Sequence, residues 1–198
     1  MKNYTKLPVY LFAVLTLGFF SCESDDPVVE NEGEVITDVI LNFQELDASN
    51  NPVGSAFSFK ASDSEGIEVG GSPTIETITL KKGKKYSMTI KVENSIEGED
   101  ITEEILAEAD EHQFFFLGGA FTNNILTIAY ADDNGIKLGV KNTLTVSSSP
   151  GTNNTTMQVV LRHDLDKNFP GATNPNFANY AQAGGETDLD ITFPIILN

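Results

Sequence analysis

The chain contains only two histidines, His112 and His163, and acidic residues adjoin both of them. The acidic residues nearest to them in the sequence are Glu108, Glu111, Asp164 and Asp166. Neutral imidazole nitrogens combined with one or two carboxylates are typical ligands of Zn²⁺ and Cu²⁺. If the fold brings the two histidines together, we expect a metal site formed by His112, His163, Glu111 and Asp164. The alternative is that each histidine ends a strand and forms ordinary hydrogen bonds there.

A second pattern concerns a hard cation such as calcium. Asp164, Asp166 and Asn168 alternate in the way that opens a calcium-binding loop. However, Phe169 stands where that loop needs a glycine, and Pro175 stands where it needs a bidentate glutamate. We therefore interpret Asp166 and Asn168 as polar side chains of an Asx-rich turn.

Motifs for catalysis are absent from the sequence. There is no G-x-S-x-G elbow, Walker loop, dinucleotide fingerprint or H-E-x-x-H helix. Carboxylate pairs are abundant, but a chain this acidic contains them by chance, so they do not support a glycosidase. The chain also lacks Trp, which weakens a sugar-binding interpretation and leaves Tyr130 and Tyr180 as the main aromatic platforms. We expect a protein that is not an enzyme.

The first residues have the layout of a bacterial secretory signal that ends at the chain's only cysteine. Lys2 and Lys6 form a positively charged start, an apolar stretch follows, and the small Ser21 precedes Cys22. A small residue before a lone cysteine resembles a lipobox, in which the cysteine thiol takes a diacylglycerol and becomes the new N-terminus. We predict a signal peptide over residues 1–21 and a lipid on Cys22 that attaches the protein to a membrane.

Residues 22–33 read as a flexible acidic tether, because they are rich in acids and contain little that a core could bury. Glu23, Asp25 and Asp26 also resemble the acidic surface-export signal of Bacteroidota lipoproteins. The sequence therefore predicts an outer-membrane lipoprotein that is exposed at the cell surface. An outer-membrane lipoprotein that faces the periplasm is the alternative.

The formal net charge of −17 becomes −19 when Lys2 and Lys6 are removed with the signal peptide. A field of this sign repels nucleic acids and anionic headgroups and suits a cationic ligand or partner. With Cys22 lipidated, the mature chain has no thiol for a disulfide. Residues 34–198 must therefore fold around an apolar core, and their length suits one domain, which we expect to be monomeric.

This domain reads as short strands separated by turn residues. The expected strands are 34–43, 56–62, 74–80, 85–93, 112–117, 125–131, 142–147, 155–162 and 187–197. The clearest expected hairpin joins 74–80 to 85–93 through a turn at Gly83. One helix is expected over about 100–110, with Asp100 and Glu103 forming a capping box. The pattern predicts an all-β, immunoglobulin-like antiparallel β-sandwich with one short crossover helix.

Three motifs carry a resemblance to a known family. They are GEDITEEILAEADEHQFFF over 98–116, LRHD over 161–164 and AGGETDLDITF over 183–193. Together they resemble a family of short Bacteroidota outer-membrane lipoproteins that is often labelled as a type 1 periplasmic-binding fold. That label implies two α/β lobes, whereas the strand pattern of this chain predicts a β-sandwich. The resemblance implies no activity, because none is established for the family.

We therefore predict a lipid-anchored, non-catalytic binding or capture module at the outer membrane, for a metal such as Zn²⁺ or Cu²⁺ or for another cationic ligand. The alternative is a structural lipoprotein that docks on an outer-membrane receptor and binds no small ligand. A hydrolase ranks third. The identity of any cofactor stays open in the sequence.

Overall fold

The computed structural model describes residues 35–67, 72–122 and 124–198. They belong to one compact unit, Gly33–Asn198, and the residues of both hydrophobic clusters lie between Ile36 and Leu197. This unit therefore contains both hydrophobic clusters of the described residues. We expect the fragment 33–198 to fold on its own and to suit experiments in solution. The predicted signal peptide and tether, with Cys22, lie outside the described residues. Within the described ranges, no helix has the length and apolarity needed to cross a bilayer.

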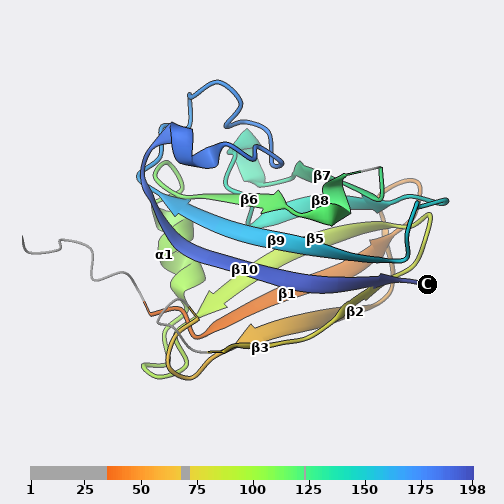
Figure 1. Cartoon of the computed structure of the whole chain (residues 1–198), viewed down its shortest axis with the longest axis horizontal. Coiled ribbons are helices and arrows are strands. Elements are labelled where there is room, and N and C mark those ends of the chain that lie inside the picture. The colour runs from red at the N-terminus through yellow and green to blue at the C-terminus, as the bar shows by residue number, and fades with distance from the viewer. Residues whose placement is uncertain (1–34, 68–71, 123) are drawn as a thin grey trace, which may run out of the picture. The chain divides into compact units, whose positions relative to one another are not determined.

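Two β-sheets pack face to face (Figure 1). The first, sheet A, has the strand order β3-β2-β1-β5-β8-β7. Its strands are β1 (Asp38–Leu46), β2 (Pro52–Ser62), β3 (Thr74–Ile75), β5 (Lys85–Glu93), β7 (Leu126–Tyr130) and β8 (Lys141–Val146). The second, sheet B, has the order β4-β10-β9-β6. Its strands are β4 (Ile78–Leu80), β6 (Gln113–Leu117), β9 (Asn154–His163) and β10 (Glu186–Leu197). The predicted all-β sandwich is confirmed.

Alternating apolar residues explain why these segments form a sandwich. In β5, the buried positions are Tyr86, Met88, Ile90 and Val92, and the residues between them are partly exposed. In β10, the buried positions are Leu189, Ile191, Phe193, Ile195 and Leu197. Side chains at alternate positions of a strand share one face, so each sheet presents an apolar face to the other.

The one α-helix of the described residues, α1 (Ile101–Ala107), connects β5 of sheet A to β6 of sheet B. Asp100 caps it, because its side chain accepts a hydrogen bond of 3.1 Å from the Thr102 amide. Ile101 and Ile105 are buried against the core. The crossover helix is therefore where the sequence predicts it, although it ends at Ala107. The described ranges also contain three short 3₁₀ helices: η1 (Gly119–Phe121), η2 (Asp133–Gly135) and η3 (Tyr180–Ala183).

The predicted hairpin between 74–80 and 85–93 is wrong. β4 pairs in parallel with β10 in sheet B, whereas β5 pairs with β1 and β8 in sheet A. The lysine-rich corner, residues 81–84, crosses from sheet B to sheet A. Its backbone forms hydrogen bonds to the residues that follow β10 of sheet B and β8 of sheet A. The Lys82 amide donates to the Asn198 carbonyl at 3.0 Å, and the Gly83 amide donates to the Ser147 carbonyl at 3.1 Å.

A long connection, residues 164–185, leads from β9 to β10 and covers the outer side of sheet B. It encloses a second hydrophobic cluster formed by Phe115, Val160, Leu165 and Ala183, with Phe169, Phe177 and Tyr180 packed against it. The Phe115 and Tyr180 rings stack with centroids 5.8 Å apart. This packing holds both ends of the connection beside His163, because Leu165 lies near its start and Ala183 near its end.

Candidate metal centre

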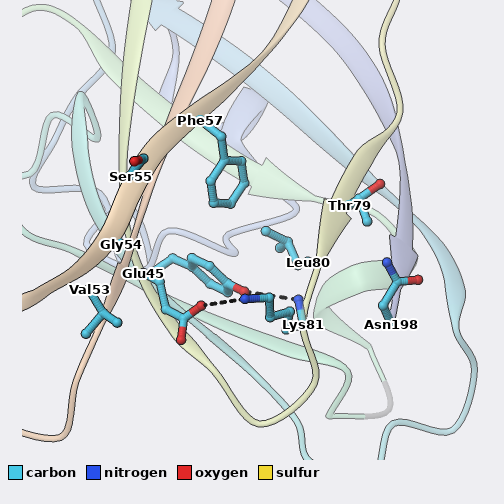
Figure 2. Close-up of a pocket in the computed structure, with 10 residues that line it drawn as sticks. Glu45, Val53, Gly54, Ser55, Phe57, Thr79, Leu80, Lys81 and Asn198 are labelled. Atoms are coloured by element: carbon cyan, nitrogen blue, oxygen red, sulfur yellow. Dashed lines mark hydrogen bonds and ion pairs between the residues drawn. The ribbon is translucent and has the colours of Figure 1, made fainter.

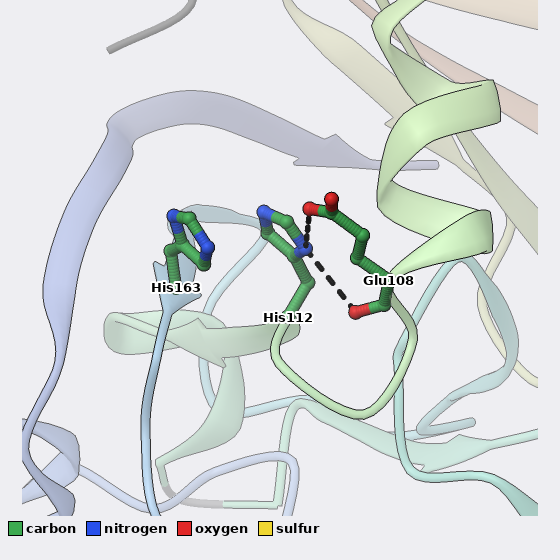
Figure 3. A group of neighbouring side chains, drawn as sticks. All are labelled: Glu108, His112 and His163. Atoms are coloured by element: carbon green, nitrogen blue, oxygen red, sulfur yellow. Dashed lines mark hydrogen bonds and ion pairs between the residues drawn. The ribbon is translucent and has the colours of Figure 1, made fainter. Parts of the chain in front are cut away.

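The register of sheet B places the two histidines side by side. β6 and β9 are antiparallel, and Gln113 pairs with Arg162. His112 directly precedes β6 and His163 ends β9, so the two residues face each other at the same end of the strand pair. Their rings stack, with centroids 4.3 Å apart and an angle of 12° between the ring planes (Figure 3).

His112 is buried and lies at the end of the turn that follows α1. Its Nδ1 atom lies 3.3 Å from the carbonyl oxygen of Glu108 and 3.8 Å from the Oε2 atom of the same residue. The backbone amide of His112 also donates to the Glu108 carbonyl at 3.1 Å. Glu108 and His112 are joined by a single turn of the chain, as Figure 3 shows. This turn places the Glu108 carboxylate beside the imidazole.

His163 is more exposed and has two carboxylates beside it. Its Nε2 atom lies 3.7 Å from Glu111 Oε2 and 3.8 Å from Asp164 Oδ1. The side chain of His163 retains 23% of its accessible surface, compared with 8% for His112. His163 therefore contacts all three of the other residues predicted for the metal site, but among the described residues no set of possible metal ligands contains all four.

Asp188 also belongs to this cluster, and the sequence gives no direct sign of it. Its Oδ2 atom lies 3.8 Å from His112 Nε2, and its side chain retains only 15% of its accessible surface. Burial raises the pKa of the Asp188 carboxyl, although the nearby histidines act in the opposite direction. The β9–β10 register is irregular between Thr187 and Leu189, so Asp188 is an extra residue at a bulge.

Asp166 and Asn168 do not join the site. The Asn168 amide donates to Asp166 Oδ1 at 2.9 Å, which is the Asx turn that the sequence indicates. The groups of side chains that are arranged to hold a metal, among the described residues, contain neither of them.

Two cations hold the backbone around the histidines. Lys167 Nζ donates to the carbonyls of Ala109 at 2.6 Å and His112 at 2.8 Å. Burial of this ammonium group lowers the pKa of Lys167. Arg162 donates to the carbonyls of Gly184 at 2.6 Å and Gly185 at 2.5 Å. These bonds link the ends of the 164–185 connection to the strands that carry the histidines.

The described side chains offer two overlapping sets of metal ligands. One set contains Glu108, His112 and His163, and the other contains Glu111, His163 and Asp164. The first set has two imidazoles and one carboxylate, a combination that suits Zn²⁺ or Cu²⁺ and leaves a fourth position open. The second set has one imidazole and is more exposed. Both sets use His163, so one metal ion occupies one set or the other. The first set is the stronger candidate because it has two imidazoles.

The distances show what metal binding would require. In each set, the ligand atoms lie within 4.8 Å of one another. Zinc bonds of about 2.1 Å bring tetrahedral ligand atoms to about 3.4 Å from one another. The ligand atoms must therefore approach one another by about 1 Å. Because an imidazole binds a metal in the plane of its ring, the stacked rings must also turn so that their nitrogens converge. Glu108 and His163 are the less buried members of the set and can make this movement. Asp188 lies near His112 Nε2, so this carboxylate would orient the imidazole if Nδ1 binds the metal.

No family model, curated protein or solved structure matches this chain. The resemblance to the Bacteroidota lipoprotein family therefore stays a prediction from the three sequence motifs.

Proposed function

We propose that this protein is a lipid-anchored, non-catalytic module that captures Zn²⁺ or Cu²⁺ at the outer membrane through His112 and His163. The observation that carries the proposal is the stacking of these two residues at 4.3 Å. They are the only histidines of the chain and lie far apart in its sequence. Glu108, on the turn that leads to His112, supplies the carboxylate that completes the set of ligands.

The charge of the protein supports this role. A chain with a formal net charge of −17 attracts cations, and its field raises their concentration near the surface. Two neutral imidazoles then distinguish a transition metal from Mg²⁺ and Ca²⁺, which prefer ligand sets made of oxygen atoms. A lipid on Cys22 would keep the captured metal at the membrane, where a receptor or transporter could take it over.

The test is a calorimetric titration of the 33–198 fragment with Zn²⁺ and Cu²⁺ in millimolar Mg²⁺ and about 0.15 M salt, which suppress loose binding to surface carboxylates. We expect one equivalent to bind. A free concentration of about 100 times the dissociation constant should raise the free energy of unfolding by about 2.7 kcal/mol.

The matched control is the double variant Glu103→Gln/Glu104→Gln, which removes two exposed acids from α1 without touching the cluster. Its affinity should equal that of the unmodified fragment. If neither metal binds stoichiometrically, the proposal fails, and docking on an outer-membrane receptor without a small ligand becomes the better account.

A further inference from the structure

A second candidate site lies at the opposite end of β10 from the histidines. His163 is paired with Glu186 at the start of this strand, whereas Leu80 is paired with Leu197 at its end. A strand rises by about 3.3 Å per residue, so about 35 Å separates the two places. At the far end, β2, β4 and the corner after β4 surround a cavity of about 410 Å³ (Figure 2). This volume is in the range of small-molecule sites.

The apolar wall of the cavity is a part of the sandwich interior that sheet B leaves uncovered. Phe57 is paired with Phe43 in the β1–β2 register, so both rings point between the sheets. Phe43 is buried, but Phe57 retains 36% of its accessible surface. The reason is that the facing edge strand, β4, is only three residues long and ends at Leu80. Figure 2 shows the Phe57 ring projecting from β2 into the space beside Leu80.

The aromatic wall is already fixed in place. Phe57 stacks on Phe43 with centroids 5.7 Å apart, and it meets the Tyr86 ring edge-on at 6.0 Å. Tyr86 is held in turn, because its hydroxyl oxygen accepts a hydrogen bond of 3.0 Å from the Lys81 amide. A planar ring that enters the cavity therefore meets a preformed aromatic surface and requires little reordering.

The charged side chains that line the cavity are Glu45 and Lys81, and Lys81 belongs to a lysine-rich corner of the chain. Four of the twelve Lys and Arg residues of the sequence lie within 81–85. Glu45 points inward at the end of β1, and two of these lysines neutralise it. Lys84 Nζ lies 2.8 Å from Glu45 Oε1, and Lys81 Nζ lies 3.2 Å from Glu45 Oε2. Hydrogen bonds from Lys84 and Lys81 lower the pKa of Glu45, so it stays ionised at neutral pH.

Of the two lysines, only Lys81 lines the cavity, and it is the more exposed and the more weakly paired with Glu45. Its side chain retains 69% of its accessible surface, and its contact with Glu45 is the longer one. If Lys81 turns to an incoming anion, Lys84 still neutralises Glu45.

We infer that this cavity binds a small aromatic carboxylate or sulfonate, with its ring against Phe57 and its acidic group beside Lys81. The inference does not depend on the proposed metal function, because the two sites share no residue. It adds an anionic organic ligand to a protein whose overall charge favours cations.

The experiment uses naphthalene-2-sulfonate as the probe and follows its binding to the 33–198 fragment by fluorescence and by amide chemical-shift changes. Neutral 2-naphthalenemethanol and cationic 2-naphthylmethylammonium are the comparison compounds. We expect the anion to bind most tightly, with shift changes confined to the cavity. The double variant His112→Ala/His163→Ala should bind it equally well.

Two substitutions test the named contacts. Lys81→Gln should weaken binding of the anion about tenfold, the size expected for an exposed charged hydrogen bond, and should leave the neutral compound unaffected. Phe57→Leu should weaken both. The control is Lys137→Gln, which removes one positive charge from the β7–β8 connection at the other end of sheet A and should change neither. Equal binding of all three compounds, or an unchanged affinity of the Lys81 variant for the anion, would overturn the inference.

Discussion

Replacing both His112 and His163 with alanine should lower the Zn²⁺ affinity of the 33–198 fragment by a factor of at least about 100. Loss of a residue that merely orients a metal ligand costs about 10- to 100-fold, and the double variant removes both nitrogen ligands themselves. The remaining carboxylates resemble those elsewhere on this acidic surface. The measurement is the same calorimetric titration in Mg²⁺ and salt.

His163→Ala alone is the safer variant for folding, because this side chain retains 23% of its accessible surface whereas His112 is buried beside Asp188. It should lose most of the affinity. The pH dependence gives an independent readout, since each imidazole must give up its proton to bind the metal. As the pH is lowered, the logarithm of the affinity should fall with a slope that approaches two in the unmodified fragment and one in this variant.

Unchanged zinc affinity in the double variant would contradict the proposed site directly. A slope near one in the unmodified fragment would show that a single histidine binds the metal. In that case, the exposed set of Glu111, His163 and Asp164 would be the better description.

Gly185→Ala should destabilise the domain and weaken metal binding together. Gly185 has φ +71°, and a Cβ atom at this position would overlap with the carbonyl oxygen of His163. The backbone conformation costs a non-glycine residue about 1–3 kcal/mol. The new methyl group also overpacks this place, because the backbone at residue 185 must move away from the His163 carbonyl. Overpacking of this kind costs about 1–3 kcal/mol more. Chemical denaturation measures the sum of both costs.

The neighbouring Gly184 provides the matched control. It has φ +81°, but nothing lies within 4 Å of the position of its Cβ atom. Gly184→Ala should therefore lose only the stability that the backbone conformation costs and should keep its zinc affinity. If the two variants lose the same stability and both bind zinc normally, the close approach of Gly185 to His163 does not position the site.

Much of the fold is predictable because its strands have a clear period. The alternation in β5 and β10 indicates which residues face the core, and Asp100 marks the start of the helix. Strand pairing is not predictable in the same way. A short turn at Gly83 between two alternating segments indicates a hairpin, but β4 instead completes the edge of sheet B. Only the packing of distant β10 beside β4 decides between the two arrangements.

Residue types predict the members of the candidate site but not the distances between them. The rarity of histidine and the acids beside both copies indicate His112, His163, Glu111 and Asp164. Their proximity depends on the β6–β9 register, which one sequence does not specify.

The sequence does not predict that Asp188 belongs to the site, again because its position depends on strand register. Strict alternation along β10 gives it the same orientation as Asp190, and only the bulge after Thr187 makes it the neighbour of His112. The sequence marks Asp188 only as one of several acids in the motif 183–193, and nothing there distinguishes it from the others.

The most direct test of the central claim is pulsed electron paramagnetic resonance of the fragment loaded with one equivalent of Cu²⁺, because this method counts the imidazoles bound to the metal. We expect two coordinated imidazoles in the unmodified fragment, one in His163→Ala and none in the double variant. A copper signal from the unmodified fragment with one imidazole or none would contradict the claim that His112 and His163 hold a metal together.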